Sequence, residues 1–306
     1  MVFDSGEPRN APSRGLHGYL SRDGIHPMKL RELGRAELAP YETVVLRDVR
    51  ITRAERCHPG FRLRTTEGDT VETRMLLLAT GRDDLLPQRP GFLELYGRGV
   101  YHCPICDGWE HRDQPLVAYG RGDAAAEMAL VLLTWSHQVT LCSDGSAQIS
   151  GRLLDQLRAH RIVVRPDEIV ELKSGTDGFL TAIRFKAGET LSVRALFFVS
   201  DCPQKSELPQ NLGCSFVASG GVACDDHAAT KVPGLFVAGN VRSGLHLAIM
   251  AAAEGAEAGV AINEALNQAE LALWTEARRW TQAKRGPSPQ PRAVKRAGNN
   301  FPGAGQ

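Results

Sequence analysis

Hydrophobic and polar positions in the first part of the chain follow two different periods. Residues 27–40 carry apolar side chains at helical spacing, and Pro40 limits the expected helix. Alternating, strand-like runs follow at 43–46, 61–64 and 70–78. We therefore expect one helix followed by a small antiparallel meander.

Two later runs are apolar without interruption and end in small residues. The first is residues 75–81, and the second is residues 235–240, which lead into an alanine-rich helix expected over 247–266. A continuous apolar run is typical of a strand buried on both faces, and small residues at its end let a ligand approach the backbone. Both runs therefore predict buried strands whose carboxyl ends lie close to a ligand.

A third pattern, between these two strands, predicts a second region of strands and helices. A strand at 116–119, a helix at about 124–135 and a strand at 139–142 form a βαβ unit that begins inside the chain. The other elements expected in this region are a helix at 151–160 and strands at 162–164, 169–172, 180–185 and 195–199. The predicted fold class is therefore α/β.

Composition limits the classes of protein that need to be considered. The chain has 306 residues, 42% hydrophobic and 23% charged, with a net charge of +1. This length favours about two domains, and the balanced charge gives no electrostatic reason to expect nucleic acid. No apolar run approaches the roughly 18 residues of a membrane helix, so we expect a cytoplasmic protein without a membrane partner. The end of the chain, rich in proline, glycine and basic residues, predicts a disordered extension.

Two of the seven cysteines are spaced for local chemistry. Cys103 and Cys106 form a Cys-x-x-Cys pair that can close a small disulfide, whereas the other five are scattered, unlike a disulfide framework. Zinc bound by this pair with His102 and His111 would be an unusual spacing, and a thioredoxin or glutaredoxin domain would begin with the motif. We therefore expect a redox dithiol and no metal. Asp107, directly after it, is a candidate helix cap or general acid/base.

A glycine-rich turn follows the strand expected at 116–119. In Gly-x-Gly-x-x-Ala between a strand and a helix, the glycines allow a tight turn and the approach of a phosphate, and the alanine lets the helix pack on the strand. An acid after the next strand can accept from a ribose 2′-hydroxyl, which favours NAD over NADP. The residues expected to contact NAD(P) are Gly120, Gly122, Asp123, Ala125 and Asp144. The alternative is a turn that binds nothing, which is favoured if Arg121 obstructs the groove.

The dithiol at Cys103–Gly108, a short way before this glycine loop, resembles that of the thioredoxin-reductase-like flavoproteins. In that family an FAD domain is interrupted by an NAD(P) domain that carries the dithiol, and residues 79–81 and 232–240 resemble its two crossing segments. The likeness covers about residues 1–268 and implies two Rossmann-like domains. The implied parts are the first part of the FAD domain at 1–98, the NAD(P) domain at 99–202, the second part of the FAD domain at 203–270 and a C-terminal extension at 271–306.

The same resemblance implies an activity. Electrons would pass from NAD(P)H through FAD to the dithiol, and on to the disulfide of a thioredoxin-like protein or a small molecule. Cys106 would face the flavin, Cys103 would meet the substrate, and Asp107 would donate and accept protons. The family also leads us to expect a homodimer. The residues that the likeness assigns to FAD are Asp4, Thr80, Gly81, Gly239, Asn240, His246, Leu247 and Ala248.

The sequence departs from the family pattern at three places, and the third leaves the direction of electron flow open. Asn240 stands where an Asp is usual beside the flavin, and His246-Leu247 stands where a Gln is common. No His-Arg-Arg type cluster follows the second strand of the NAD(P) region, so the usual basic site for a 2′-phosphate is missing. A flavin dithiol oxidase, which passes electrons from a dithiol to oxygen, is therefore an alternative function.

The start of the chain is a further departure. Residues 2–4 resemble the end of the FAD domain's second strand, with Asp4 as the ribose acid. By the usual spacing of about 20 residues, the FAD glycine loop would lie before Met1, and two neighbouring strands would lack the strand between them. Either translation starts upstream, or the chain is a truncated relative with impaired FAD binding, which includes a non-enzymatic one. The complete dithiol and both crossing segments favour the first explanation.

Overall fold

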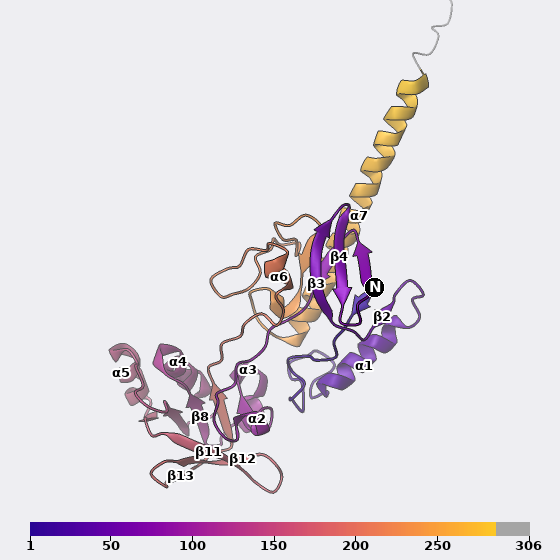
Figure 1. Ribbon diagram of the computed structural model, residues 1–306. Coiled ribbons are helices and arrows are strands. Elements are labelled where there is room, and N and C mark those ends of the chain that lie inside the picture. Colours follow the sequence, from indigo (N-terminus) through magenta and orange to yellow (C-terminus); the bar gives the residue numbers. More distant parts are fainter. Residues whose placement is uncertain (286–306) are drawn as a thin grey trace, which may run out of the picture. The chain divides into compact units, whose positions relative to one another are not determined.

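The computed structural model describes the backbone of residues 1–285 and the side chains of residues 1–276. Contacts between Cα atoms divide the chain into two units, Met1–Ile262 and Asn263–Gln306. The first unit contains the parallel sheets and helices predicted from the sequence, so the α/β fold class is confirmed (Figure 1).

The first helix, α1 (Pro27–Leu38), forms where the apolar spacing predicts it. It begins with proline, whose missing N–H is not needed in the first turn, and His26 Nδ1 accepts a hydrogen bond from the backbone N–H of Met28 at 3.2 Å. Before and after α1, β1 (Val2–Phe3) pairs in parallel with β2 (Leu46–Arg47). The strand predicted at 43–46 is therefore shorter and begins later than expected.

An antiparallel meander follows, but its strands differ from the predicted ones. It consists of β3 (Ile51–Cys57), β4 (Gly60–Thr65) and β5 (Thr70–Thr73), of which β3 was not predicted. The prediction of a single strand over 70–78 is wrong, because these residues form two strands that belong to two different sheets. Its second half, β6 (Leu76–Leu78), pairs in parallel with β15 (Leu235–Val237) instead.

The parallel strands of the two ends of the chain form two separate two-stranded sheets, β1–β2 and β6–β15. Among the residues that the structure describes, no ladder hydrogen bonds join the pair β1–β2 to the pair β6–β15. The parallel register of β6 and β15 sets Leu78 opposite Val237, so the carboxyl ends of both strands lie at the same edge. The segments that follow these two strands are thereby brought together.

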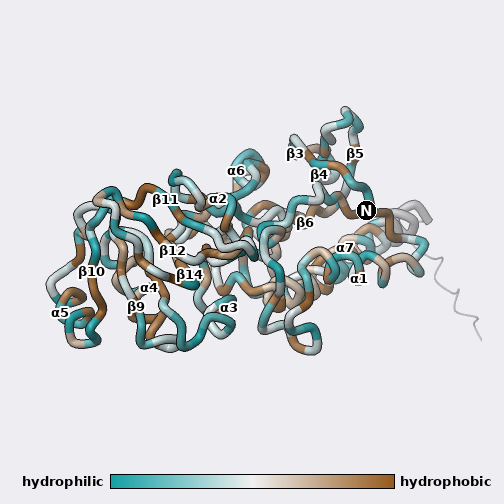
Figure 2. Tube along the Cα trace, turned by 90° about the horizontal axis from the view of Figure 1, so that it is seen from below, coloured by the Kyte–Doolittle hydropathy of each residue, from teal (hydrophilic) through white to brown (hydrophobic). Residues whose placement is uncertain are grey.

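The central part of the chain forms a five-stranded parallel sheet. Its strand order is β10 (Val163–Arg165), β9 (Val139–Cys142), β8 (Leu116–Tyr119), β14 (Ala195–Phe198) and β7 (Val100–Tyr101). Figure 2 shows the apolar stretches that run through β9 and β10. The predicted βαβ unit is confirmed, and β8 and β9 have the predicted bounds.

Both faces of this sheet are covered, which explains its continuous apolar strands. On one face, Leu116 and Phe197 pack against α4 (Gly122–Leu132) and α5 (Gly151–Ala159). On the other, alternate residues such as Val117 pack against a three-stranded antiparallel sheet (Figure 1). That sheet contains β11 (Ile169–Ser174), β12 (Leu180–Phe185) and β13 (Thr190–Ser192).

The last helix, α7 (Ala248–Arg285), is longer than the helix predicted over 247–266. The predicted disordered extension at 271–306 is therefore wrong for 271–285, which are helical, and residues 286–306 lie outside the described part of the chain. Among the described residues, no helix is both long and apolar enough to cross a membrane.

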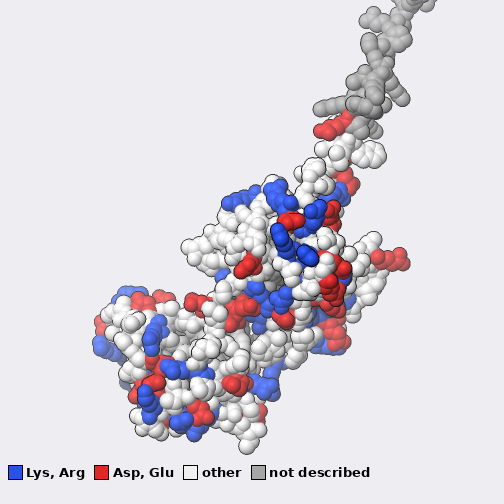
Figure 3. Space-filling view, viewed as in Figure 1, with Lys and Arg blue, Asp and Glu red and all other residues white. Residues whose placement is uncertain are grey.

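On the face seen in Figure 3, basic and acidic side chains are interspersed. The remaining short helices are α2 (Phe92–Leu95), α3 (Pro104–Asp107), η1 (Trp109–His111), α6 (Leu208–Asn211) and η2 (Gly239–Val241).

Candidate functional site

The two predicted redox cysteines form a disulfide at the start of α3. Cys103 occupies the position before the first turn, and Pro104 begins the helix, as proline often does. The Sγ atom of Cys103 accepts a hydrogen bond from the backbone N–H of Cys106 at 3.1 Å. Such a hydrogen bond stabilises the thiolate form of a cysteine, so this geometry favours Cys103 as the reactive sulfur of the reduced pair.

Tight packing fixes the orientation of α3. A Cβ atom added to Gly108 would overlap both Trp135 Nε1 and the carbonyl oxygen of Pro104, so only glycine fits there. Trp135 follows α4, and its ring also lies edge-on to that of Trp109, with ring centroids 6.4 Å apart. The dithiol is thereby held against the helix that follows the glycine loop.

Asp107 lies beside the disulfide, and about half of its carboxyl groups are protonated at pH 7. Burial raises the pKa of its carboxyl to about 7, the charge of Glu110 acts in the same direction, and His17 opposes it. A group with this pKa can both donate and accept a proton near pH 7. The predicted acid/base role of Asp107 is therefore chemically available.

The two histidines that flank the dithiol are neutral at pH 7. Burial lowers the pKa of His102 to about 4 although Asp84 acts in the opposite direction, and burial with Arg194 lowers the pKa of His111 to about 4. Neither ring can therefore supply positive charge to a thiolate. Among the described residues, no three potential metal ligands lie close enough to bind an ion.

A polar network that sequence reasoning missed leads away from His102. The hydroxyl of Tyr96 lies 2.8 Å from His102 Nδ1 and donates to Asp84 at 2.6 Å. Asp84 also accepts from Arg9 Nε at 2.8 Å and from the thiol of Cys202 at 3.2 Å. Burial opposes ionisation of Asp84, but Arg9, His102 and Tyr96 together lower its pKa to about 2. No local pattern signals this network because its members come from distant segments.

The residues predicted to hold the flavin meet where β6 and β15 end. Thr80 and Gly81 follow β6, and Gly239 and Asn240 follow β15. Both glycines have positive φ, 73° at Gly81 and 71° at Gly239, which suits residues without a Cβ. The backbone N–H of Gly239 donates to the carboxylate of Glu254 at 2.7 Å, which holds this turn against α7.

An orphaned oxygen at this edge fits a bound cofactor. The hydroxyl Oγ1 of Thr80 is buried without a hydrogen-bond partner in the described part of the chain. Because buried polar atoms are normally paired, this hydroxyl and the two positive-φ glycines suit a hydrogen-bonding ligand such as a flavin. The predicted flavin residues at this edge are therefore compatible with FAD.

The other residues predicted to contact FAD lie outside the two turns that follow β6 and β15. Asp4 is held by Arg31 and Arg35; burial opposes its ionisation, but the Gly6 N–H and Arg31 lower its pKa below the usual value. His246 Nδ1 lies 3.4 Å from Arg9 Nη1; Leu247 directly precedes α7, and Ala248 is its first residue. Their roles towards FAD stay predictions.

Arg82, directly after Gly81, is a buried cation that ties several loops together. It is 5% exposed and donates to three backbone carbonyls, those of Asn240 at 2.9 Å and of Cys202 and Ser219 at 3.0 Å. Its Nη2 atom has no partner in the described residues, and burial lowers the pKa of its guanidinium. The sequence pattern did not indicate this residue.

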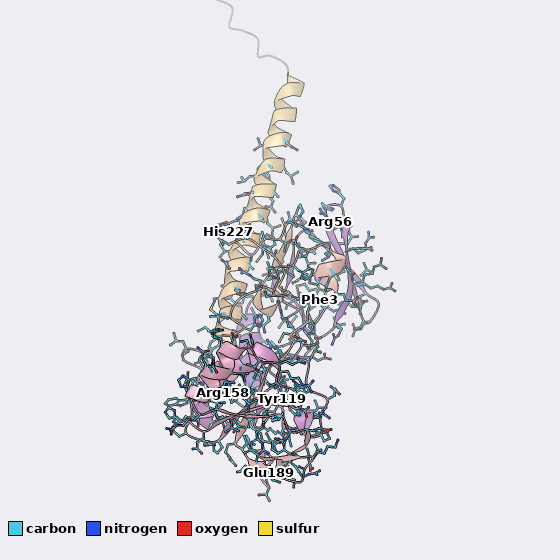
Figure 4. The ribbon with its side chains drawn as sticks, turned by 90° about the vertical axis from the view of Figure 1, so that its left-hand side faces the viewer. Phe3, Arg56, Tyr119, Arg158, Glu189 and His227 are labelled. Carbon is cyan, nitrogen blue, oxygen red and sulfur yellow. A yellow bond between two sulfur atoms is a disulfide. The ribbon has the colours of Figure 1, made fainter. Side chains whose placement is uncertain are left out.

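Replacing Arg82 with alanine should destabilise the protein. The change leaves three backbone carbonyls without the donor that now ties their loops together and opens a cavity at a buried position, which we expect to lower the free energy of unfolding by about 2–4 kcal/mol. Arg56→Ala, at an exposed position of β3 labelled in Figure 4, should change it by less than about 0.5 kcal/mol. Urea unfolding of both variants measures the difference, and equal stability would contradict this account of Arg82.

The glycine loop forms a tight turn between β8 and α4. Gly120 and Gly122 have φ of 146° and 74°, and α4 begins at Gly122. Ala125 is fully buried, and a Cβ on Gly120 would lie 3.3 Å from its Cβ, so small residues let this helix approach the strand. Asp123 turns its carboxylate to the N–H of Ser150, at 2.7 Å. The structure thus brings the predicted loop residues together.

Asp144 is placed differently from its predicted role. It is 8% exposed, and its Oδ2 atom accepts from Arg89 at 2.8 Å and from the hydroxyl of Tyr119, labelled in Figure 4, at 3.1 Å. Its Oδ1 atom accepts from the N–H of Ile169 at 2.9 Å. Both oxygens are committed to the protein, so the geometry does not favour contact with a ribose hydroxyl.

Comparison with known proteins places these features in one family. The family model of the pyridine nucleotide-disulphide oxidoreductases matches residues 31–255. Thioredoxin reductase tcpT of Claviceps purpurea is 30% identical over 251 residues, 78% of each chain, and thioredoxin reductase aclD of Aspergillus oryzae is 25% identical over 273 residues, 86% of this chain and 87% of the relative.

Solved structures agree with this relationship. That of HlmI has a TM-score of 0.86 at 33% identity and covers 91% of this chain and 88% of its own. Thioredoxin reductase from Streptococcus pyogenes has a TM-score of 0.79 at 23% identity, covers 87% and 90% of the two chains, and shows the shared fold of two Rossmann-like domains. With its disulfide and its glycine loop on this fold, the chain belongs to the pyridine nucleotide-disulphide oxidoreductases and is a thioredoxin-reductase-like oxidoreductase.

Proposed function

We propose that this protein is an FAD-dependent enzyme that uses NAD(P)H to reduce a disulfide substrate through Cys103 and Cys106. The observation that carries the proposal is the disulfide of these two residues beside Asp107, whose pKa of about 7 suits proton transfer at neutral pH. The names of its relatives as thioredoxin reductases support the same reaction class.

The proposed step on the substrate is thiol–disulfide exchange. The Cys103 thiolate attacks one sulfur of the substrate disulfide, breaks that bond and forms a mixed disulfide. The Cys106 thiolate then attacks Cys103 Sγ, which closes the Cys103–Cys106 disulfide and releases the second substrate sulfur. The substrate gains two electrons and two protons and becomes two thiols: one proton is the one that the Cys106 thiol gives up as it becomes a thiolate, and the other comes from the protonated carboxyl of Asp107.

The dithiol must then be restored. Thr80, Gly81, Gly239 and Asn240 would hold the flavin at the common edge of β6 and β15, and its chemistry is the two-electron transfer between a reduced nicotinamide and a disulfide. The orphaned hydroxyl of Thr80 is the observation that supports this assignment.

The substrate should contact apolar surface beside the dithiol. Ile105 and Trp109, on either side of Cys106, are 63% and 57% exposed, and the guanidinium of Arg112 lies 4.2 Å from the centre of the Trp109 ring. Exposed apolar residues at a redox site suit a thioredoxin-like protein or an apolar small-molecule disulfide. A homodimer remains part of the proposal by likeness to the family.

Turnover of the full chain, purified with FAD, tests this function. We expect NADPH or NADH to be consumed under anaerobic conditions when a thioredoxin-like protein or a small disulfide is added. A flavin dithiol oxidase would instead consume oxygen when a dithiol is added in air, and it would consume almost no NADPH or NADH. That second result would overturn the proposed direction of electron flow.

A further inference from the structure

Residues 16–25, between β1 and α1, form a small hairpin that carries His17. The backbone N–H of Leu16 donates to the carbonyl of Ile25 at 2.8 Å, and the N–H of Gly24 donates to the carbonyl of Leu16 at 2.8 Å. The side chain of Leu16 is buried. These contacts fix the backbone next to His17, so the hairpin sets the direction in which the imidazole points.

The segment that contains this hairpin packs against residues much further along the chain. A Cβ atom added to Gly97 would lie 2.2 Å from the carbonyl oxygen of Pro12, so the two backbones touch at a position where only glycine fits. The guanidinium of Arg14 lies 4.6 Å from the centre of the Phe179 ring. The segment before α1 is thereby held in a defined place beside the central part of the chain.

His17 reaches the dithiol segment through Glu110. Its Nδ1 atom lies 3.4 Å from a carboxylate oxygen of Glu110 and 3.7 Å from one of Asp23, so the protonated ring forms ion pairs with both. A Cβ atom on Gly15 would lie 3.1 Å from His17 Nε2, so the other ring nitrogen lies close to the backbone. Glu110 belongs to η1 and follows Asp107 by three positions. His17 is therefore one ion pair away from the acid beside the disulfide.

Two charged side chains of the described residues act on Asp107 in opposite directions. Burial is the main cause of its raised pKa; among the charges, that of Glu110 raises the pKa further, and that of His17 lowers it. Tyr101 also faces Asp107, but burial, with the charge of Asp107, raises the pKa of its hydroxyl to about 12, so it is neutral at pH 7. The ring of His111, 3.1 Å from that hydroxyl, is neutral as well. The charge beside Asp107 is therefore set by Glu110 and His17.

We propose that His17 is a positioning residue for proton transfer: its imidazolium, held by the hairpin, partly cancels the negative charge that Glu110 places beside Asp107. Such a balance keeps both the protonated and the ionised carboxyl populated near neutral pH, which general acid–base catalysis requires. The proposal rests on the proposed function in so far as Asp107 supplies a proton to the substrate. It gives the segment before α1 a part in the chemistry of a dithiol that lies far along the chain.

The midpoint of Asp107 protonation in the full chain tests this role. Infrared spectra recorded against pH measure the midpoint without substrate or nicotinamide, and the band of the protonated carboxyl is assigned by its loss in Asp107→Asn. His17→Gln, which removes the positive charge, should raise the midpoint by about 0.5–1 pH unit, and Glu110→Gln should lower it by about as much. The pH above which Asp107 ceases to accelerate turnover should move in the same two directions.

Three further variants serve as controls. His17→Lys restores a positive charge and should keep the midpoint close to that of the unmodified chain. His160→Gln, at the exposed C-terminal end of α5, and Glu37→Gln, at an exposed position of α1, remove the same kinds of side chain away from the dithiol. Both should leave the midpoint unchanged.

A purely structural role of His17 predicts a different result. Loosened packing would expose Asp107 to water and lower the midpoint in His17→Gln, whereas loss of the positive charge raises it. A midpoint that falls or stays unchanged in His17→Gln, or that is not restored in His17→Lys, would therefore overturn the proposal.

Glu110→Gln leaves the hairpin intact, so it tests the same balance of charge even if His17→Gln does not fold. A midpoint that does not fall in Glu110→Gln would also contradict the proposal. Because the infrared titration needs no electron transfer, opposite shifts in a chain that does not reduce disulfides would refute the proposed function and leave the balance of charge around Asp107 intact.

Discussion

Replacement of Cys103 with serine should reduce disulfide turnover by at least about a thousand-fold, since a serine hydroxyl is a far weaker nucleophile than a thiolate and cannot form the mixed disulfide. The Cys106 N–H that now donates to Cys103 Sγ favours the thiolate of this residue. Steady-state consumption of NADPH with a saturating disulfide substrate measures the loss.

The companion variant distinguishes the roles of the two sulfurs. Cys106→Ser should also be inactive in turnover, but its Cys103 should still attack a small disulfide and retain half of it, which mass spectrometry of the intact chain detects. Cys57→Ser, which removes a half-buried cysteine of β3 outside the site, should leave turnover unchanged. If Cys106→Ser fails to trap the mixed disulfide while Cys103→Ser traps it, the assigned roles are reversed.

Asp107→Asn should lower kcat by about 100-fold or more, because general acid–base catalysis commonly contributes 10²–10⁴-fold. Burial raises the pKa of Asp107 to about 7, so below this pH the residue carries the proton that it donates to the leaving sulfur. The ratio of unmodified to variant activity should therefore be largest below pH 7 and fall above it. A ratio that does not change between pH 6 and 9 would contradict proton donation by Asp107.

The same variant should have a separate effect on stability. Between about pH 4 and pH 7 the unfolded chain releases the Asp107 proton, while the folded chain keeps it because its pKa is raised. The stability that the neutral acid provides is complete below the unfolded pKa and is lost as the pH rises through about 7. Asp107→Asn, which stays neutral, should have a higher free energy of unfolding than the unmodified chain at pH 8, by up to about 4 kcal/mol for a pKa raised by about three units, and the same free energy of unfolding at pH 4.

The fold was predictable where a whole strand or helix has one uniform pattern of buried residues. β8 and β9 have their predicted bounds because all of their residues except Thr140 pack in the core on one face or the other of the parallel sheet. Prediction failed over 70–78, where one apolar run serves two sheets, since the partner of β6 lies far along the chain. It also failed for the end of α7, where the helix continues through residues 271–285 and the side chains of residues 271–276 are exposed.

The site divides in the same way. The dithiol, Asp107 and the glycine loop were predictable because each is a local motif whose chemistry depends on neighbouring residues. Arg82 and the network around Asp84 were not, because carbonyl and carboxylate partners reach them from segments remote in sequence. For Asp144 the position was predicted and the orientation was not, since Arg89 lies on a loop that no motif connects to it.

The pairing of β6 with β15 has a consequence for the order of events during synthesis. Roughly 160 residues separate the two strands, so at about 5–20 residues per second β6 leaves the ribosome some 8–30 seconds before its partner exists. Closing so long a loop is entropically costly unless the intervening residues have already folded and drawn its ends together. The five-stranded sheet should therefore fold first. Thr80 and Gly239 should come together only after β15 has been synthesised and has paired with β6.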